Sequence, residues 1–417
     1  MSTYETVKNI CANAKAASVS LSALNAREKN AILATIKALL WDNRESVMSA
    51  NQKDIDTAQA NGIPTPMLDR LLLNEQRIHG ICSSLDTLIS LPDPVGSGEV
   101  FTTSGGLEIC CERVPLGVVA IIYEARPNVT VDAAALCLKT GNAVVLRGGR
   151  EALNTNIELI RIMKNALQSC NISPDALGFV ESGNGHESAN ALMSMRGLVD
   201  VLIPRGSARL IRSVVDNAKV PVIETGAGNC HLYVDESADI DMAVRVAINA
   251  KCSRPAVCNA IETMLVHSSV AQKFLPEFEK AVSDKSLEIR ACERTRKILP
   301  SASVATETDF ETEYDDLILA VKIVDSVDEA IAHINKYNTG HSEAIITNSQ
   351  ANANKFRQYV DAAAVYVNAS TRFTDGGEFG FGAEIGISTQ KLHARGPMGL
   401  AALTTQKYLI NGNGQIR

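Results

Sequence analysis

Apolar residues at helical spacing dominate the first quarter of the chain. One run places its large apolar side chains on a single face: Ile32, Leu33, Ile36, Leu39 and Leu40. Asn25, followed three residues later by Glu28, is the pattern of a capping box at the start of that helix. The stretch "ANGIP" at 60–64 supplies a C-cap glycine, Gly62, and a proline beyond it. We therefore expect residues 1–95 to be helical.

The pattern changes at residue 96. The segment 96–114 reads as two strand-like runs around Ser104-Gly105-Gly106, which predicts a hairpin that projects and pairs with another subunit. The chain ends with a further strand pattern, "TTQKYLIN", at 404–411.

Strand and helix patterns alternate through residues 115–225. Five short apolar runs read as strands: "GVVAIIY" (117–123), "AVVLR" (143–147), "LGFV" (177–180), "DVLIP" (200–204) and "VPVIE" (220–224). Amphipathic helical patterns lie between them, which is typical of a doubly wound parallel sheet with helices on both faces.

A second α/β pattern occupies residues 230–385. Its strand-like runs are "HLYVD", "ETMLVH", "LAVKIV", "EAIIT" and "AVYVN". Ser326 and Glu329 form a capping-box pattern before a helix between two of these runs. The fold class is therefore α/β, with two doubly wound parallel-sheet domains and a small β element.

Composition and charge exclude several classes of partner. The net charge of −7 and the 4% aromatic content argue against a nucleic-acid surface. The N-terminus lacks a signal-peptide core, and no apolar run is long enough to cross a membrane. We therefore expect a cytoplasmic protein whose ten cysteines are reduced thiols. Neither a CxxC pair nor a zinc-like His spacing occurs, so no metal site is expected.

Two turns that follow predicted strands could hold an anion. Arg147-Gly148-Gly149 follows one strand, and Arg205-Gly206-Ser207 follows another and opens a helix. Ligands of open α/β sheets bind beyond the carboxyl ends of the strands, so both turns would face one edge. The alternative is two plain turns with surface arginines. A GxGxxG fingerprint between a strand and a helix is absent, so a dinucleotide site rests on the topology alone.

The stretch "KCSRPAVCNAIET" at 251–263 contains two cysteines, Cys252 and Cys258, and either could be a nucleophile or an apolar filler. Cys258 follows a short loop that contains Arg254, which would favour the thiolate. Cys230-His231 is not a catalytic pair, because neighbouring strand residues point to opposite faces.

Two more segments carry groups suited to catalysis. Glu224 ends a predicted strand and is either a base in a cleft or a solvated strand end. In "IYEARPN", Arg126 could hold a carboxylate or phosphate, and Asn128 could donate to an oxyanion. The alternative for this segment is a structural turn set by Pro127.

Several blocks together resemble the gamma-glutamyl phosphate reductases, a branch of the aldehyde dehydrogenase superfamily. The most specific are "YEARPNVTVDAAALCLKTGN", "PVIETGAGNCHLYVDES", "RPAVCNAIET" and "STRFTDGGEFGFGAE". The resemblance covers nearly the whole chain and implies an aldehyde dehydrogenase-like fold.

That fold implies a division of the chain into domains. Residues 1–95 and 115–225 would form a dinucleotide-binding domain, and 226–386 a catalytic domain with the nucleophilic cysteine. Residues 387–403 would return to the cofactor domain. The remaining segments would be oligomerisation strands: 96–114 and 404–417.

The resemblance also assigns roles. It makes Cys258 the nucleophile and Cys252 a packing residue, and it places Glu224 at the general-base position of the superfamily. Arg147 stands where the superfamily has a cofactor lysine, and Arg205-Gly206-Ser207 stands at the cofactor pyrophosphate. For the oxyanion residue, a gap-free count gives Glu124, whereas we favour Asn128. Arg126, Arg254 and Arg372 are the candidates for binding the substrate anion.

The implied reaction is the NADPH-dependent reduction of L-glutamyl 5-phosphate to L-glutamate 5-semialdehyde and phosphate, through a Cys258 thioester. This is the second step of proline biosynthesis from glutamate, which suggests contact with a glutamate 5-kinase. The oligomerisation strands of the fold imply a homo-oligomer. Rival hypotheses are an oxidising aldehyde dehydrogenase, a CoA-acylating reductase and a non-catalytic protein on the same scaffold.

Overall fold

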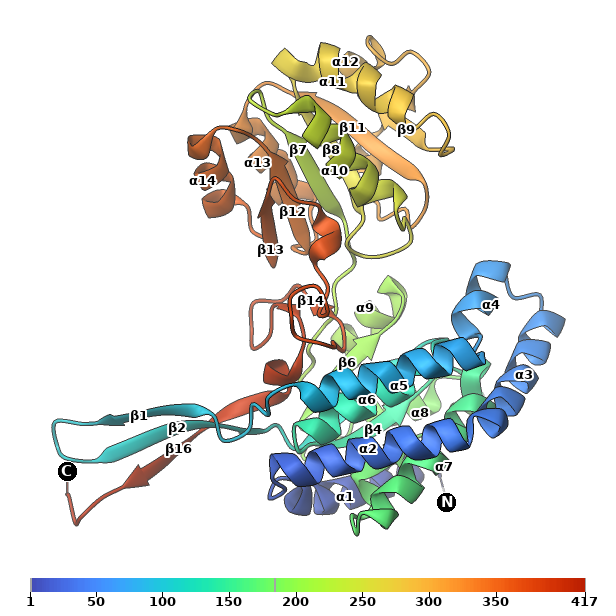
Figure 1. The fold of residues 1–417 in the computed structure, drawn as a ribbon, viewed down its shortest axis with the longest axis vertical. Coiled ribbons are helices and arrows are strands. Elements are labelled where there is room, and N and C mark those ends of the chain that lie inside the picture. Colours follow the sequence, from blue (N-terminus) through green and yellow to red (C-terminus); the bar gives the residue numbers. More distant parts are fainter. Residues whose placement is uncertain (1, 184, 417) are drawn as a thin grey trace. The chain divides into compact units, whose positions relative to one another are not determined.

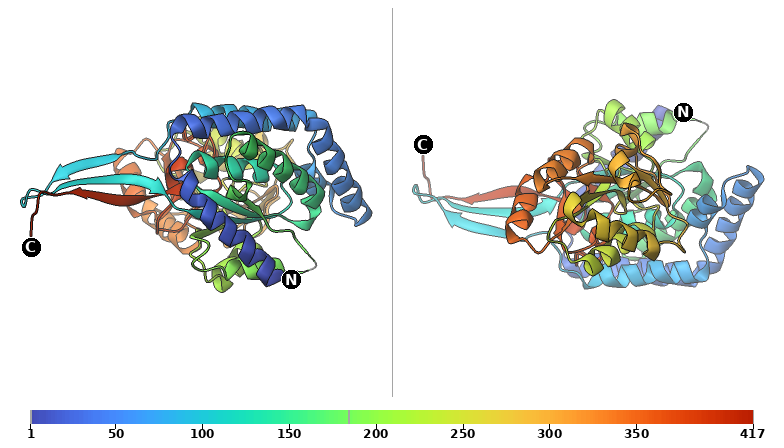
Figure 2. Two further views of the ribbon diagram at one scale, coloured as in Figure 1. Left: turned by 90° about the horizontal axis from the view of Figure 1, so that it is seen from below. Right: turned by 90° about the horizontal axis from the view of Figure 1, so that it is seen from above.

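The computed structural model describes residues 2–183 and 185–416. By its internal contacts the chain divides into two compact units. The first contains residues 1–224, 380–386 and 398–417, and the second contains residues 225–379 and 387–397. Figures 1 and 2 show the elements of each unit.

The first unit is built around a four-stranded parallel sheet in the order β5-β4-β3-β6. Its strands are β3 (Val118–Tyr123), β4 (Ala143–Arg147), β5 (Leu177–Phe179) and β6 (Val201–Arg205). Its helices are α1 (Thr3–Leu21), α2 (Ala26–Asp42), α3 (Arg44–Ala60), α4 (Thr65–Leu71), α5 (Glu75–Ser90), α6 (Asn128–Lys139), α7 (Leu153–Ser169), α8 (Glu187–Met193) and α9 (Ala208–Asn217).

Helices cover both faces of this sheet. Helices α1 and α8 pack together on one face, and α6 and α7, with α2 outside them, pack on the other (Figures 1 and 2). All six residues of β3 are buried, as expected for a central parallel strand. The helical prediction for the N-terminal segment is confirmed, including the reciprocal capping box between Asn25 and Glu28.

A three-stranded antiparallel sheet projects from the first unit. It contains β1 (Gly98–Thr102), β2 (Glu108–Pro115) and β16 (Thr404–Asn411), in the order β1-β2-β16. The predicted hairpin and the predicted terminal strand are thus confirmed, and they lie side by side in one sheet.

The second unit is built around a seven-stranded parallel sheet in the order β10-β9-β11-β8-β7-β12-β13. Its strands are β7 (Cys230–Val234), β8 (Ile261–His267), β9 (Glu288–Ala291), β10 (Ser303–Val304), β11 (Ile318–Val324), β12 (Ser342–Ile346) and β13 (Ala364–Val367). Its helices are α10 (Ile240–Cys252), α11 (Ser268–Ala281), α12 (Glu293–Arg296), α13 (Val327–Tyr337) and α14 (Gln350–Tyr359).

Alternate residues of the central strands contribute to two separate apolar cores, one on each face of the sheet. Leu232 and Val234 of β7 pack in a cluster with residues of α10 and α11. Tyr233, between them, packs in a separate cluster with residues of α13 and α14. The sheet is therefore covered on both faces, and the predicted α/β class with two parallel sheets and a small antiparallel sheet is confirmed.

One predicted strand is wrong. Residues 220–224 form no strand, and their only ladder contact is an isolated bridge between Val222 and Leu202 of the edge strand β6. Pro221 accepts a hydrogen bond from Leu202 but has no N–H to continue the ladder. Glu224 therefore lies within a loop that continues to the start of β7, and it does not end a strand.

The two units divide the C-terminal region differently from the domains expected from the sequence. Residues 380–386 cluster with the first unit and 387–397 with the second. Gly226 donates to the Ile387 carbonyl, and β14 (Ile387–Ser388) pairs with β15 (Gly396–Pro397). These contacts tie 387–397 to the start of the second unit.

Candidate active site

The carboxyl ends of β3, β4 and β6 lie along one edge of the first sheet. The register pairs Ile122 with Arg147 on one side of β3, and Tyr123 with Arg205 on the other. The two turns singled out in the sequence are therefore brought to the same edge, one on each side of β3.

The turn after β4 is tightly packed around its glycines. A Cβ on Gly148 would lie 2.3 Å from the Asn156 amide nitrogen, and one on Gly149 would lie 2.5 Å from a Glu151 carboxylate oxygen. Close packing within the unit thus accounts for both glycines. Arg147 is different: its Nε is buried without a hydrogen-bond partner among the described residues. Burial also lowers the pKa of its guanidinium, against the opposing effect of Glu151.

The turn after β6 holds an anion at the start of α9, and that anion is the protein's own Glu124. Its carboxylate accepts hydrogen bonds from the Ser207 backbone N–H at 2.7 Å and from the Ser207 hydroxyl at 3.0 Å. The same hydroxyl caps α9 by accepting from the Leu210 N–H. A Cβ on Gly206 would lie 2.5 Å from a Glu124 carboxylate oxygen, so glycine gives the carboxylate its room.

Asn128, the first residue of α6, belongs to a polar cluster at this edge. Its side-chain amide donates to the Asp132 carboxylate at 3.0 Å. Burial raises the pKa of Asp132 to about 6, while the Asn128 hydrogen bond and the charge of Arg205 act in the opposite direction. Arg126, two residues before Asn128, is exposed. One amide hydrogen of Asn128 is therefore committed to Asp132, and one is left for another acceptor.

In the second unit, Cys258 lies in the loop between α10 and β8 and is half-buried. Its carbonyl oxygen accepts a hydrogen bond from the Cys230 thiol at 3.2 Å. A Cβ on Gly228 would lie 1.6 Å from that oxygen, so the two backbones are in direct contact. The Gly228 N–H in turn donates to the Glu313 carboxylate at 2.7 Å. The backbone of Gly228 and the buried side chain of Cys230 thus hold the Cys258 loop in place.

Asn259, next to Cys258, ties the loop to a later segment of the chain. Its amide donates to the carbonyl of Thr374 at 3.0 Å, and its own carbonyl accepts from the Thr371 hydroxyl at 2.6 Å. Its side-chain oxygen accepts a hydrogen bond from the Arg372 guanidinium. A segment more than 100 residues later in the chain therefore clamps the Cys258 loop.

Two of the predicted substrate arginines lie beside Cys258. Burial lowers the pKa of Arg372, the positive charge of Arg254 lowers it further, and Cys258 acts in the opposite direction. The guanidinium of Arg372 also donates to the hydroxyl of Ser253 in the same loop. Arg254, Arg372 and Cys258 thus form one electrostatic cluster within the second unit. Arg126 belongs to the first unit.

A buried contact between Lys251 and Glu262 joins the two ends of this loop. Lys251, in the last turn of α10, lies 2.5 Å from the carboxylate of Glu262 in β8, and both side chains are almost completely buried. Burial raises the pKa of Glu262 to about 8, against the charge of Lys251. The helix that precedes the loop is thereby tied to the strand that follows it.

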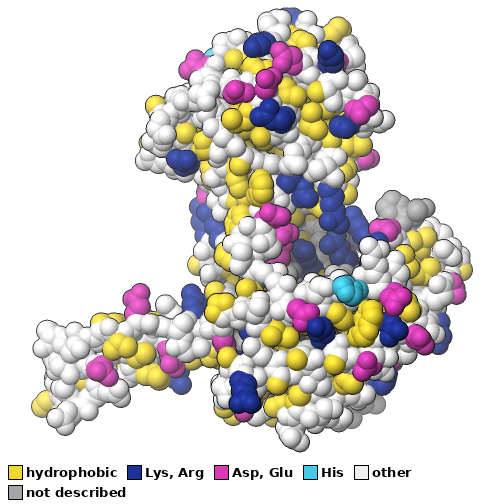
Figure 3. Space-filling model, viewed as in Figure 1, with side chains coloured by type: hydrophobic (Ala, Val, Ile, Leu, Met, Phe, Trp, Pro, Cys, Tyr) yellow, Lys and Arg dark blue, Asp and Glu magenta, His cyan; other side chains and the backbone are white. Residues whose placement is uncertain are grey.

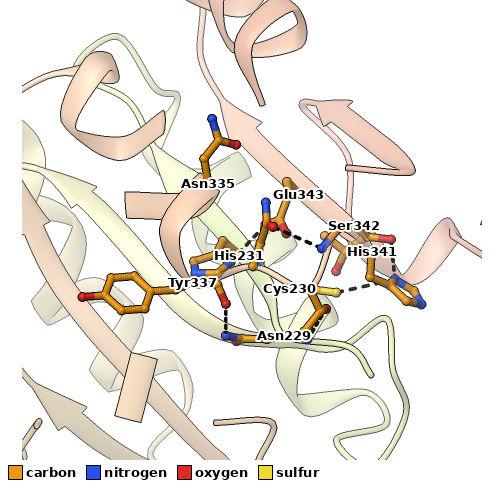
Figure 4. A network of polar contacts seen from close by, with 12 residues as sticks. Asn229, Cys230, His231, Asn335, Tyr337, His341, Ser342 and Glu343 are labelled. Carbon is orange, nitrogen blue, oxygen red and sulfur yellow. Dashed lines mark hydrogen bonds and ion pairs between the residues drawn. The ribbon is translucent and has the colours of Figure 1, made fainter. Parts of the chain in front are cut away.

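Cys230 and His231 point away from each other, as expected for neighbours on a strand (Figure 4). The Cys230 thiol faces the Cys258 loop and lies 3.7 Å from His341. His231 bonds the Glu343 carboxylate through its backbone N–H at 2.7 Å and its ring at 3.1 Å. Burial lowers the pKa of His231 to about 3 and raises that of Glu343, so this contact joins two neutral groups.

Sequence reasoning missed the residues that hold the site in place. Gly228, Cys230, Glu313 and Thr371 touch or support the Cys258 loop from distant positions in the chain. No local pattern marks them. Glu124 was noted only as a position count, although an acidic residue directly after a strand, at the edge expected to bind an anion, was a usable signal.

Other kinds of site find no support in the described part of the chain. Within residues 2–183 and 185–416, no group of three or more His, Cys, Asp or Glu side chains is arranged to hold a metal. All ten cysteines are thiols there. Among the same residues, no helix combines the length and apolar character needed to cross a bilayer.

Known proteins resemble the chain over its full length. The model of the aldehyde dehydrogenase family matches residues 1–300 and 317–406. The gamma-glutamyl phosphate reductase of Carboxydothermus hydrogenoformans is 57% identical over 412 residues, which is 99% of each chain. The chain belongs to the gamma-glutamyl phosphate reductase family. The resemblance found in the sequence is thereby confirmed, and the chain is a dehydrogenase of the aldehyde dehydrogenase family.

Solved structures agree with this family. The gamma-glutamyl phosphate reductase of Thermotoga maritima superimposes with a TM-score of 0.97 at 47% identity, covering 99% of each chain. The glyceraldehyde-3-phosphate dehydrogenase GapN of Methanocaldococcus jannaschii, solved with NADP, has a TM-score of 0.71 at 18% identity and covers 98% of this chain and 95% of its own. That likeness concerns the fold alone, and the aldehyde dehydrogenase family is shown by the match of its model to the chain.

Proposed function

We propose that this protein reduces L-glutamyl 5-phosphate with NADPH to L-glutamate 5-semialdehyde and phosphate, the second step of proline biosynthesis from glutamate. The family supplies the reaction. The observation that supports the mechanism is the Cys258 loop. Its thiol is half-buried, two arginines lie beside the thiol, and the backbone of the loop is held in place at both ends.

In the first step, the Cys258 thiolate attacks the acyl carbon, and phosphate leaves from the tetrahedral intermediate. Arg254 and Arg372 favour the thiolate over the thiol, because a nearby positive charge stabilises the anion. The Cys258 backbone N–H and the remaining amide hydrogen of Asn128 are the proposed donors to the oxyanion. Arg126, Arg254 and Arg372 are the proposed partners of the substrate carboxylate and phosphate.

The cofactor is proposed to bind at the edge of the first sheet. NADPH, when bound, supplies the hydride that converts the thioester to a thiohemiacetal, which collapses to the aldehyde and the thiolate. The donors of Ser207 already hold a carboxylate, so they fit a phosphate of the pyrophosphate. The unpartnered Nε of Arg147, with Gly148 and Gly149, is proposed to face the adenosine 2′-phosphate, which favours NADPH over NADH.

No water-activating base is needed in this direction, because hydrolysis of the thioester would waste the substrate. We therefore propose that Glu224 positions groups or serves the structure. Glu224→Gln is expected to keep reductase activity within about threefold of wild type. Near-complete loss of turnover in a protein with unchanged circular dichroism would contradict this assignment.

An assay in the reverse direction separates the reductase from its rivals. Purified protein is given glutamate 5-semialdehyde and NADP, and NADPH formation is followed by absorbance. The proposal expects oxidation that requires inorganic phosphate. Oxidation to the acid without phosphate would support an oxidising aldehyde dehydrogenase, and oxidation that requires CoA in place of phosphate would support a CoA-acylating enzyme. Either result would overturn the proposed reaction.

The projecting sheet is the proposed oligomerisation element. Its outer strands carry exposed large apolar side chains: Val100, Phe101, Tyr408, Leu409 and Ile410. Hydrophobic side chains are visible along this sheet in Figure 3. Exposed apolar patches and open strand edges are characteristic of surfaces that bind another chain. We propose a cytoplasmic homo-oligomer that pairs through this sheet, with a glutamate 5-kinase as the supplier of the unstable acyl phosphate.

A further inference from the structure

The Glu124 side chain occupies the donors to which the proposed function assigns a cofactor phosphate. Its backbone position is fixed, because its N–H continues the β3–β6 ladder by donating to the Arg205 carbonyl at 3.2 Å. From there its carboxylate receives both the backbone and the hydroxyl donor of Ser207. The start of α9 is thereby provided with a negative charge from within the chain.

The local packing is shaped for this carboxylate. A Cβ on Gly206 would lie 2.5 Å from its oxygen and 2.8 Å from its carboxyl carbon. Only glycine at this position lets a planar anion lie against the turn. The atoms in contact are the mobile end of a side chain, so a rotation of the Glu124 side chain would vacate the same space without any movement of the backbone.

A second observation at the same edge points to a ligand. On the other side of β3, the Nε of Arg147 is buried without a hydrogen-bond partner among the described residues. This cation donor and the Ser207 donors flank the strand end from which Glu124 extends. The edge is therefore equipped for anions on both sides, and on one side an anion of the protein already fills the position.

We propose that the Glu124 carboxylate competes with the cofactor pyrophosphate for the N-terminus of α9 and thereby sets the affinity for NADPH. This inference rests on the proposed cofactor site. Two anions cannot share the Ser207 donors, since they would repel each other at hydrogen-bond distance. Each binding event therefore includes rotation of Glu124 away from Ser207, and each release of NADP is assisted by its return.

The test compares dissociation constants of wild type and Glu124→Gln, measured by calorimetry with NADPH and with adenosine 2′-monophosphate. The glutamine keeps the size of the side chain and removes its charge. The expected result is a dissociation constant for NADPH lowered by roughly 3- to 30-fold. Adenosine 2′-monophosphate lacks the pyrophosphate, so its constant should not change. Glu45→Gln, which removes an exposed carboxylate elsewhere in the first unit, is the matched control and should bind both ligands like wild type.

Each other outcome overturns the inference in a distinguishable way. Equal NADPH binding by wild type and Glu124→Gln would show that Glu124 does not compete, while leaving the proposed cofactor intact. Weaker binding by the variant would make Glu124 a direct ligand of the nucleotide. Failure of both proteins to bind NADPH would remove the proposed cofactor as well. Glu124→Ala, which removes the carboxylate entirely, should repeat the direction seen with glutamine.

Discussion

The two halves of the proposed site are built on different principles. At the edge of the first sheet, donors and arginines follow three neighbouring strands, and the parallel topology alone brings them together. Around Cys258, the contacts come from the segments 228–230 and 371–374, which meet only in the folded second unit. The proposed binding edge can be altered one side chain at a time, whereas the proposed nucleophile, Cys258, depends on a loop that many residues hold in place.

Removal of the proposed nucleophile should produce the largest effect. Cys258→Ala is expected to lower reductase turnover by more than about 1,000-fold, because no other group can form the thioester. Cys252→Ala, six residues earlier and at the end of α10, should remain close to wild type. Steady-state kinetics on both variants decide between the two thiols. Equal losses would contradict the assignment of Cys258.

The second prediction concerns Gly228, whose backbone packs against that of Cys258, the proposed nucleophile. In Gly228→Ala, a Cβ would meet the Cys258 carbonyl at a separation that requires the loop to move. We expect kcat to fall by about 100-fold, since small displacements of a reacting group cost that much. Gly80→Ala, where a Cβ has open space, is the control and should leave kcat unchanged. A fully active Gly228→Ala would show that the loop accommodates the added methyl group without displacing Cys258.

The third prediction tests the charges beside the thiol. Arg372→Gln removes a cation from the neighbourhood of Cys258 and a bond to the Asn259 side chain. We expect the rate of Cys258 alkylation by iodoacetamide at pH 7 to fall by roughly 3- to 10-fold, because less thiolate is present. Arg294→Gln, which breaks an exposed pair with Asp325, is the matched control. An unchanged alkylation rate would contradict this role for Arg372 and leave Arg254 as the cation that favours the thiolate.

The fourth prediction concerns the stability of the second unit at acid pH. Burial lowers the pKa of His333 to about 3, from an ordinary value near 6.5. As the pH falls below 6.5, the unfolded chain takes up a proton at this residue that the folded unit does not, so stability is lost towards pH 3. The stability advantage of wild type over His333→Leu should therefore shrink by roughly 2 kcal/mol between pH 7 and pH 4.5. Hydrogen exchange of the β7 amides measures it, and a constant difference would contradict the burial of a neutral His333.

The sequence predicted the elements of both units because hydrophobic periodicity is a local property. It identified β3, β4 and β16 almost to the residue, and the hairpin of β1 and β2. The strand predicted at 220–224 is wrong. The segment is apolar, but Pro221 and the position of the segment beside the edge strand β6 limit its pairing to one bridge. The sequence also did not reveal β9, in which charged and apolar residues alternate, or β10, which has only two residues.

The candidate site was predictable only in part, for the same physical reason. Arg147 and Arg205 could be placed at one edge from topology alone. Cys258 and Arg372 could be joined only through the family resemblance, since their contact runs through Asn259 and depends on the tertiary fold. The Glu124–Ser207 contact joins residues 83 positions apart, and no periodic pattern reports on such a pair.

The projecting sheet also imposes an order of events during synthesis. Arg113 near the end of β2 bonds Thr404 at the start of β16, 291 positions later. At about 5–20 residues per second, β2 leaves the ribosome tens of seconds before the strand that completes its sheet. During that interval the nascent chain presents a hairpin with one open edge and no mature surface for a partner. If this sheet is the oligomerisation element proposed above, assembly through it has to wait until β16 has been synthesised, and translation then sets the earliest time of subunit association.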